Sequence, residues 1–302
     1  MTAMHASRRR ARRRGRSRVE VILLVCLAIV IVAVAWPMLA RARRAGDPAA
    51  DAHDLGEAFQ AMVAYANGHG GLFPRPSEAA THDGSDPTLD TSAHLYALLL
   101  ADRGVAARQL ISRAERNPAV EAIDYDFRQV NPAEGRLWDP GFRTELDRPP
   151  GEGVCHTSYV HLALCGDRAA RWRPSSGVET VLLGDRATRR GTQEGKAWTR
   201  SYTMGRDGRP EGLWGGNLVF GDGHVELLTT FRPPGVTWTC GSIKPTKDNI
   251  FDCEFNQLDC TNAVRDGRIA GDVWLCLVDH VEGPHHLGVD VVERLEDGSM
   301  PR

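Results

Sequence analysis

The sequence lacks the short motifs that mark common catalytic and nucleotide-binding sites. It has no Gly-x-Ser-x-Gly elbow, no phosphate-binding glycine loop followed by lysine, no dinucleotide fingerprint and no His-Glu-x-x-His pair. It also has no Cys-x-x-Cys pair, the spacing typical of structural zinc sites. These absences exclude the enzyme classes that depend on such motifs, and we expect no enzymatic activity.

A large charge of one sign is also missing, because the 302 residues carry a formal net charge of only −2. Eight arginines lie between Arg8 and Arg18, and no acidic residue precedes Glu20, so the remainder of the chain is acidic. A broad basic surface for nucleic acid is therefore not expected. A content of 42% hydrophobic and 25% charged residues is typical of a globular domain with a core of its own.

The sequence has one long apolar run, from Val21 to Ala40, with no charged residue in 20 positions. At about 1.5 Å per residue, a helix of this length spans the roughly 30 Å hydrocarbon core of a bilayer. The arginines before the run favour a cytoplasmic N-terminus and an extracytoplasmic remainder. We therefore expect a single-pass membrane helix over residues 20–40. A cleaved secretory signal is the alternative, but arginines stand where such a cleavage would fall.

A glutamate and a proline stand at the two ends of this run. Glu20 is a functional candidate, because an unpaired carboxylate at the edge of hydrocarbon is costly. Pro37 is expected to kink the helix, since proline lacks an N–H and clashes with the preceding turn. A cut after Gly15 would make Arg16 the first residue and Glu20 the fifth.

These spacings resemble the class III signal of type IV pilins and type II secretion pseudopilins. The resemblance implies that a prepilin peptidase removes residues 1–15 and that the new amino terminus is methylated. It also implies that Glu20 pairs with the amino terminus of a neighbouring subunit during filament assembly. The family usually has an apolar residue just after the cut, whereas this chain has Arg16. An uncleaved anchor is the alternative interpretation.

The segment "DLGEAFQAMVAYANGHGGLFP", residues 54–74, predicts an amphipathic helix that stops near Asn67-Gly68. The apolar residues at helical spacing are Leu55, Phe59, Met62, Val63 and Ala66. The end of this segment resembles the "YAN…GG.FP" close of the first helix in a large bacterial branch of pseudopilin-like proteins. That branch often carries a His-x9-Asp-Gly motif near its C-terminus.

The segment "GGNLVFGDGHVELL", residues 215–228, predicts a β-hairpin with a type I′ turn at Asp222-Gly223. It resembles the "N.LF.DGHV" segment of the same branch, and "VETVLLGDR", residues 178–186, is similar to its "LLADR" strand. Gly212 stands where the branch has its histidine. The motif residues are Asn217, Phe220, Asp222, Gly223 and His224.

Other elements are read from local pattern alone. Residues 90–104 predict a second helix with a polar cap and a terminal glycine, and residues 156–166 predict a strand.

Six cysteines lie beyond the apolar run, an even count that favours disulfides in an oxidising compartment. They are Cys155, Cys165, Cys240, Cys253, Cys260 and Cys276. The closest pairs in sequence are Cys155 with Cys165 and Cys253 with Cys260. Free buried thiols are the alternative.

Several clusters offer metal ligands, although we expect no metal and no cofactor. The zinc alternative uses Cys155, His156, His161 and Cys165. Asp222, His224 and Glu226 are an alternative metal or catalytic cluster. A transition-metal alternative uses the tail residues Asp279, His280, Glu282, His285, His286 and Asp290. Calcium is possible at the acidic segments 82–90 and 247–254, but neither has EF-hand spacing.

The sequence thus predicts an α+β, pilin-like fold in three parts: a leader (1–15), a long helix (16–68) and an exported antiparallel β-sheet domain (69–302). The expected function is a pseudopilin-like structural subunit of a type II secretion or type IV pilus-like filament. The expected location is the bacterial inner membrane. Expected partners are a prepilin peptidase, other pseudopilin subunits, the inner-membrane secretion platform and the membrane. The alternatives are a membrane-anchored envelope protein that binds a ligand without polymerising, and a membrane-tethered metal-dependent enzyme.

Overall fold

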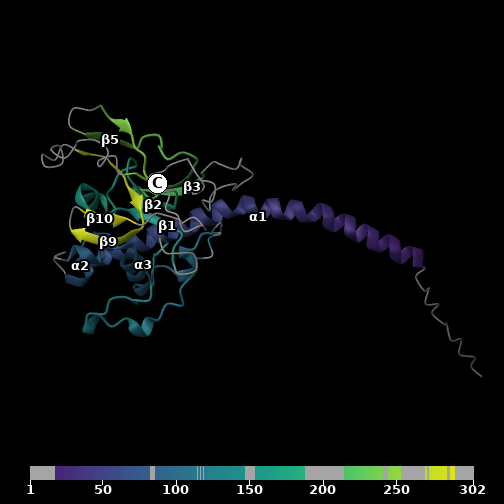
Figure 1. Ribbon diagram of the computed structural model, residues 1–302, viewed down its shortest axis with the longest axis horizontal. Helices are drawn as coiled ribbons and strands as arrows, with labels where there is room; N and C mark the ends of the chain where they lie inside the picture. The colour runs from purple at the N-terminus through teal and green to yellow at the C-terminus, as the bar shows by residue number, and fades with distance from the viewer. Residues whose placement is uncertain are drawn as a thin grey trace, which may run out of the picture. The chain divides into compact units, whose positions relative to one another are not determined.

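The computed structural model describes residues 18–81, 86–113, 115, 117, 119–146, 154–187, 214–240, 244–252, 269–270, 272–283 and 286–289. The chain divides into two compact units, Met1–Arg44 and Ala45–Arg302. Helix α1 (Arg18–Gly68) has 51 residues and contributes to both units (Figure 1).

The predicted membrane-spanning half of the long helix is wrong. Within the described residues, no helix combines the length and the apolarity that a membrane crossing needs. The predicted location, a single-pass protein of the inner membrane, is therefore also wrong.

In the second unit, α1 packs one apolar face into the core, as the periodicity predicted. Leu55 and Met62 are fully buried and Phe59 is 4% exposed. The helix ends at Gly68, which confirms the predicted stop. Gly70 and Gly71 then adopt positive φ angles of 68° and 83°, a conformation that favours glycine. The Gly71 N–H donates to the Ala66 carbonyl at 2.8 Å and thereby closes the helix end.

The core of the second unit is a five-stranded antiparallel sheet, which confirms the α+β class. Its strand order is β4-β3-β2-β1-β8, and every pairing is antiparallel. The strands are β1 (Tyr159–Leu162), β2 (Val181–Asp185), β3 (Gly216–Phe220), β4 (Val225–Leu228) and β8 (Leu275–Cys276). Every residue of β1, β2 and β3 is buried, so the centre of the sheet is enclosed on both faces.

Shorter elements surround this sheet. The helices are α2 (Pro76–Thr81) and α3 (Ser92–Ala101), with 3-10 turns η1 (Pro87–Leu89), η2 (Ala107–Leu110), η3 (Phe127–Gln129), η4 (Pro132–Glu134) and η5 (Gly166–Arg171). A second sheet joins β6 (Thr246–Lys247), β5 (Thr237–Cys240) and β7 (Ile269–Ala270), and a third joins β9 (Val278–Gly283) to β10 (His286–Val289). The Thr91 hydroxyl accepts the His94 N–H at 3.2 Å and caps α3, the predicted second helix.

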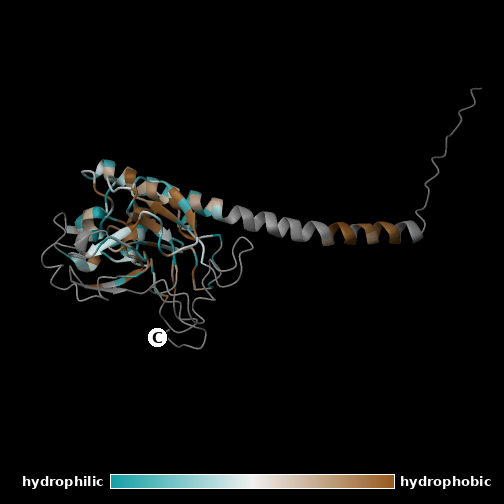
Figure 2. Ribbon diagram, turned by 90° about the horizontal axis from the view of Figure 1, so that it is seen from above, coloured by the Kyte–Doolittle hydropathy of each residue, from teal (hydrophilic) through white to brown (hydrophobic). Residues whose placement is uncertain are grey.

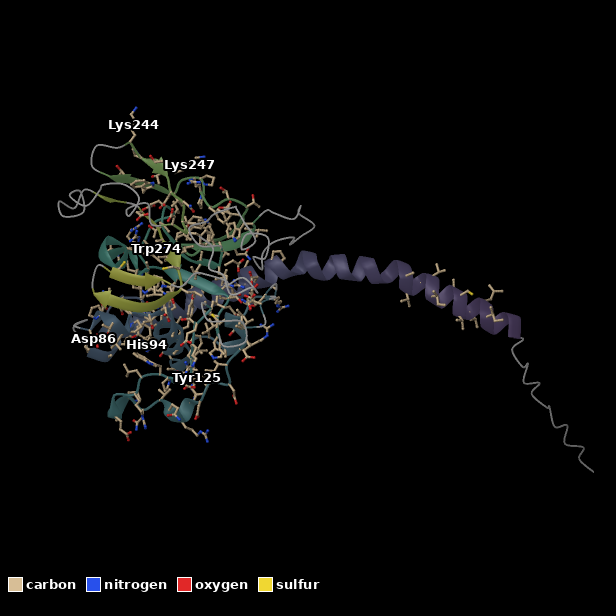
Figure 3. The ribbon with its side chains drawn as sticks, in the orientation of Figure 1. Asp86, His94, Tyr125, Lys244, Lys247 and Trp274 are labelled. Atoms are coloured by element: carbon tan, nitrogen blue, oxygen red, sulfur yellow. The ribbon has the colours of Figure 1, made fainter. Side chains whose placement is uncertain are left out.

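Tyr125 and His94 help to hold α3 in place (Figure 3). The Tyr125 hydroxyl donates to the Ala97 carbonyl at 2.8 Å, and the His94 ring nitrogen Nδ1 lies 2.9 Å from the Leu89 carbonyl. Burial raises the pKa of Tyr125 to about 12, so its hydroxyl stays a donor at neutral pH.

The predicted hairpin is confirmed, but its turn type is wrong. Strands β3 and β4 pair with Val219 opposite Val225. Gly223 has φ 88°, whereas Asp222 does not have a positive φ, and a type I′ turn needs both. The Gly223 N–H donates to Phe220 O at 2.8 Å, and the Phe220 N–H donates to His224 O at 3.0 Å. This is the pattern of a longer connection that ends in a left-handed glycine.

The predicted disulfide between Cys155 and Cys165 is wrong. Cys155, Cys165 and Cys276 are free thiols, and all three are buried. Strand β1 lies between Cys155 and Cys165 and separates them, because an extended strand rises about 3.3 Å per residue. The Cys155 thiol donates instead to the Thr157 carbonyl at 3.1 Å. Cys253, Cys260 and the side chain of Cys240 lie outside the described residues.

Candidate interaction sites

The first unit presents an apolar helix surface on α1. Its members, each between 45% and 66% exposed, are Ile22, Leu23, Leu24, Val25, Leu27, Ile29, Val30, Ile31 and Val32. Figure 2 shows this part of α1 as the hydrophobic stretch of the helix. Consecutive helical residues are about 100° apart, so this surface surrounds the helix. A helix that is apolar all round is normally buried in its working state.

The predicted processing residues lie at or beyond the start of this helix. Gly15 and Arg16 lie outside the described residues. The backbone of α1 runs through Glu20 and Pro37, whose side chains are not described. Cleavage after Gly15 and pairing by Glu20 therefore stay predictions.

Asn217 of the hairpin motif joins the sheet to α1. Its side-chain Nδ2 donates to Pro48 O at 3.0 Å and to Asp51 Oδ2 at 3.1 Å. The Tyr159 hydroxyl donates to the other oxygen of Asp51 at 2.9 Å, and Asp185 accepts the Asn217 N–H at 2.7 Å. All four side chains in this network are buried. Burial raises the pKa of Tyr159, with Asp51 adding to the effect, so the phenol remains a donor.

The remaining motif residues shape the hairpin tip. Asp222 accepts the His224 backbone N–H at 3.1 Å, and the His224 ring nitrogen Nδ1 lies 2.5 Å from the same carboxylate oxygen. These two hydrogen bonds lower the pKa of the Asp222 carboxyl. The His224 ring stacks on Phe220 with centroids 4.3 Å apart. A Cβ on Gly223 would lie 2.6 Å from Phe59, so the tip rests directly on α1. The motif residues thus pack the hairpin against α1.

The residues of the zinc alternative have other partners. His156 Nδ1 lies 2.9 Å from the Glu121 carbonyl. His161 is fully buried, and its Nε2 lies 2.7 Å from Ser92 Oγ. Among the described residues, no group of three or more His, Cys, Asp or Glu side chains is arranged to hold a metal ion. The side chains of His280, Glu282, His285, His286 and Asp290 lie outside that part of the chain.

A buried Ser-His pair was not predicted from the sequence. Ser92 Oγ lies 2.7 Å from His161 Nε2, and His161 Nδ1 lies 2.8 Å from the Leu162 carbonyl. A carbonyl only accepts, so Nδ1 carries the proton and Nε2 accepts from the Ser92 hydroxyl. Burial lowers the pKa of His161 to about 4. Both residues have 0% exposure, so a substrate has no access and the pair ties α3 to β1.

The strand motif "LLGDR" ends in a buried ion pair. Arg186 Nη2 donates to Glu115 Oε1 at 2.7 Å, and Arg186 Nε donates to Oε2 at 3.1 Å. The Ser158 hydroxyl adds a third bond to Glu115 at 2.9 Å. Burial alone would raise the pKa of Glu115, but the Arg186 charge outweighs it and lowers that pKa.

A cavity of about 530 Å³ lies within the second unit, at the C-terminal end of α1. Its lining includes Tyr65, His69, Leu72, Leu98, Ala101 and Asp102. Sequence reasoning missed it, because its walls come from segments as far apart as α1 and residues 130–137. The glycine-rich "GHGGLFP" turn was the one local signal.

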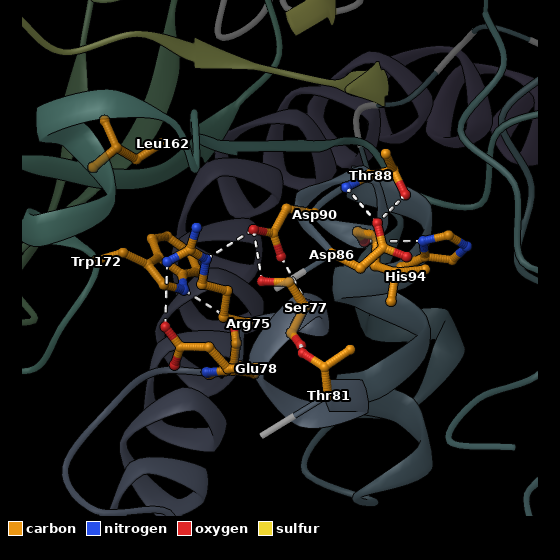
Figure 4. Close-up of polar contacts among 12 residues, drawn as sticks. Arg75, Ser77, Glu78, Thr81, Asp86, Thr88, Asp90, His94, Leu162 and Trp172 are labelled. Carbon is orange, nitrogen blue, oxygen red and sulfur yellow. Dashed lines mark hydrogen bonds and ion pairs between the residues drawn. The ribbon is translucent and has the colours of Figure 1, made fainter. Parts of the chain in front are cut away.

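The polar side of this cavity is built by Arg75 (Figure 4). Arg75 Nε donates to Asp90 Oδ2 at 2.8 Å, and Nη1 donates to Glu78 Oε1 at 3.2 Å. Asp90 also accepts the Ser77 N–H and hydroxyl, each at 2.9 Å. Burial would lower the pKa of Arg75, but Asp90 outweighs it, and the guanidinium stays charged.

Comparison with known proteins adds no relative. No protein-family model, no curated protein and no solved structure matches this chain.

Proposed function

We propose that this chain is a pseudopilin-like structural subunit that assembles into a filament of the type II secretion or type IV pilus kind. The observation that carries the proposal is the apolar helix surface, which surrounds α1 between Ile22 and Val32 and is exposed there. Burying such a surface gains about 25 cal/mol per Å², and like helices from other copies offer a matching apolar surface.

The leader sequence supplies the rest of the proposal. A prepilin peptidase cuts after Gly15, and Glu20 pairs with the amino terminus of a neighbouring copy. The partners are therefore the peptidase, other subunits of the same kind and a secretion platform. The second unit, in which Asn217 of the sheet bonds to Asp51 of α1, is a folded domain outside the helix bundle of the filament.

The first test is processing. The full chain is produced together with a prepilin peptidase, and its intact mass and N-terminal sequence are measured. A chain that begins at Arg16 with a methylated amine supports the proposal. A chain that keeps its arginine leader contradicts it.

The second test is assembly, followed by electron microscopy and sedimentation of the processed chain. Leu27 is an exposed member of the apolar helix surface. Leu27→Asp is expected to abolish filaments, because assembly would bury the new charge among apolar helices. Leu227→Asp is the matched control, since Leu227 is exposed on β4 in the second unit. Glu20→Ala should also reduce assembly, with exposed Glu226→Ala as its control. Filaments that tolerate Leu27→Asp and Glu20→Ala would rule the proposal out.

A further inference from the structure

The cavity at the end of α1 has an apolar wall and an acidic rim. Leu72, Leu98 and Ala101 provide apolar surface, and Leu72 is 47% exposed. Glu78 and Asp102 provide carboxylates. A volume of about 530 Å³ falls within the range of ligand pockets in proteins.

The charges around this cavity do not cancel. The guanidinium of Arg75 forms ion pairs with both Asp90 and Glu78, so this group of three side chains contains two negative charges and one positive charge. Asp102 adds a third carboxylate, and its side chain has no hydrogen bond or ion pair within the described part of the chain. The adjacent Arg103 does not neutralise Asp102, because its guanidinium lies over the Phe127 ring, 4.7 Å from the centroid.

Tyr65 offers the cavity a hydrogen-bond donor. The residue is only 8% exposed, and its hydroxyl has no hydrogen bond within the described part of the chain. Burial raises the pKa of Tyr65, with Asp102 and then Glu78 adding to the effect, so the hydroxyl keeps its proton. The His69 ring stacks on Tyr65 at 3.8 Å and widens the aromatic wall.

We propose that this cavity binds a basic peptide segment of a partner protein, with one lysine or arginine side chain inserted. The aliphatic stem lies along Leu72 and Leu98, and the cationic head meets Asp102. Long basic side chains pack their stems on apolar surface in this way. A peptide carbonyl accepts from the Tyr65 hydroxyl. The carboxylate excess and the unused donor select this chemistry over an anion or a purely apolar ligand. The inference does not rest on the proposed filament.

The test uses the full chain and a fluorescein-labelled Leu-Arg-Leu amide, followed by fluorescence anisotropy. Leu-Arg-Leu is expected to bind, whereas Leu-citrulline-Leu, which has nearly the same shape without the charge, should bind at least threefold more weakly. Asp102→Asn should weaken binding of the arginine peptide about threefold to fivefold. Tyr65→Phe keeps the ring and should weaken binding about fivefold, through loss of one hydrogen bond.

The matched control is Asp124→Asn, an exposed acid outside the cavity lining, which should leave binding unchanged. Circular dichroism confirms that each variant is folded. Equal binding of the arginine and citrulline peptides would overturn the proposal, as would equal effects of Asp102→Asn and Asp124→Asn. If Asp102→Asn instead abolishes association between copies of this chain, the occupant is a second copy and a separate partner is ruled out.

Discussion

Glu115 and Arg186 form the most enclosed ion pair among those described, with side chains 3% and 4% exposed. Such a pair is weakly stabilising as a whole, because both charges lose their hydration. Removing one partner is different, because the other charge is left buried and uncompensated. Removing one partner should therefore lower the free energy of unfolding by more than the intact pair contributes to it.

Arg186→Met is expected to lower the free energy of unfolding by about 3–5 kcal/mol, because Glu115 is left without its cation. Urea denaturation of the full chain measures this. Arg136→Met removes the exposed pair with Glu134, and should change the same quantity by less than about 1 kcal/mol. Equal losses from the two substitutions would show that Glu115 is not effectively buried.

The Glu115 carboxyl also makes stability depend on pH. Its pKa in the folded chain is below the ordinary 4.5, so the folded state favours the ionised form. The stabilisation is fully present above pH 4.5 and is lost as the pH falls through the folded pKa. The difference in unfolding free energy between the wild-type chain and Glu115→Gln should therefore be flat above about pH 5 and shrink below it. A difference that grows on acidification contradicts this.

At the scale of the element, the β3–β4 hairpin depends on one glycine for two reasons. Gly223 has φ 88°, and a Cβ there would lie 2.6 Å from Phe59. Gly223→Ala should destabilise the chain by about 2–4 kcal/mol, measured by thermal or urea unfolding. Gly135→Ala is the matched control, with φ 74° but open space around it, and should cost only about 1 kcal/mol. Equal costs would mean that the tip is not held against α1.

The sequence predicted those elements whose pattern is local. The periodicity of Leu55, Phe59 and Met62 identified the buried face of α1, because helix geometry alone sets that spacing. Alternation on either side of Asp222-Gly223 identified the hairpin, but the turn type was missed, because Gly223 has a positive φ and Asp222 does not.

Contacts between distant segments were not predictable in the same way. The Asn217 side chain reaches Asp51 across 166 positions, and His161 reaches Ser92 across 69. The cavity depends on the same kind of assembly, since Tyr65 and Leu137 come together only in the fold. The prediction of a Cys155–Cys165 disulfide failed because an even number of cysteines does not tell how far apart their sulfur atoms lie in the fold.

At the scale of the whole molecule, acid should weaken the second unit in two steps. His161 has a folded pKa of about 4 against 6.5 ordinarily, because burial disfavours its charged form. The unfolded chain binds that proton first, so stability falls between pH 6.5 and 4, by up to roughly 3 kcal/mol at about 1.36 kcal/mol per pKa unit. The loss from Glu115 follows below pH 4.5.

Unfolding free energies measured from pH 7 to pH 4 test the first step. His161→Gln should flatten the pH dependence in that window, even if the variant is less stable overall. An unchanged slope in His161→Gln would assign the step to another group.

The free thiol of Cys26 lies within the apolar helix surface, and it is exposed, whereas the thiols of Cys155, Cys165 and Cys276 are buried. Reagents that add to sulfur should therefore reach Cys26 before those three. The same atom can carry a spin label without any engineered cysteine. Dipolar coupling between labels on neighbouring copies would then measure helix proximity directly, in the position where association would bring the helices together.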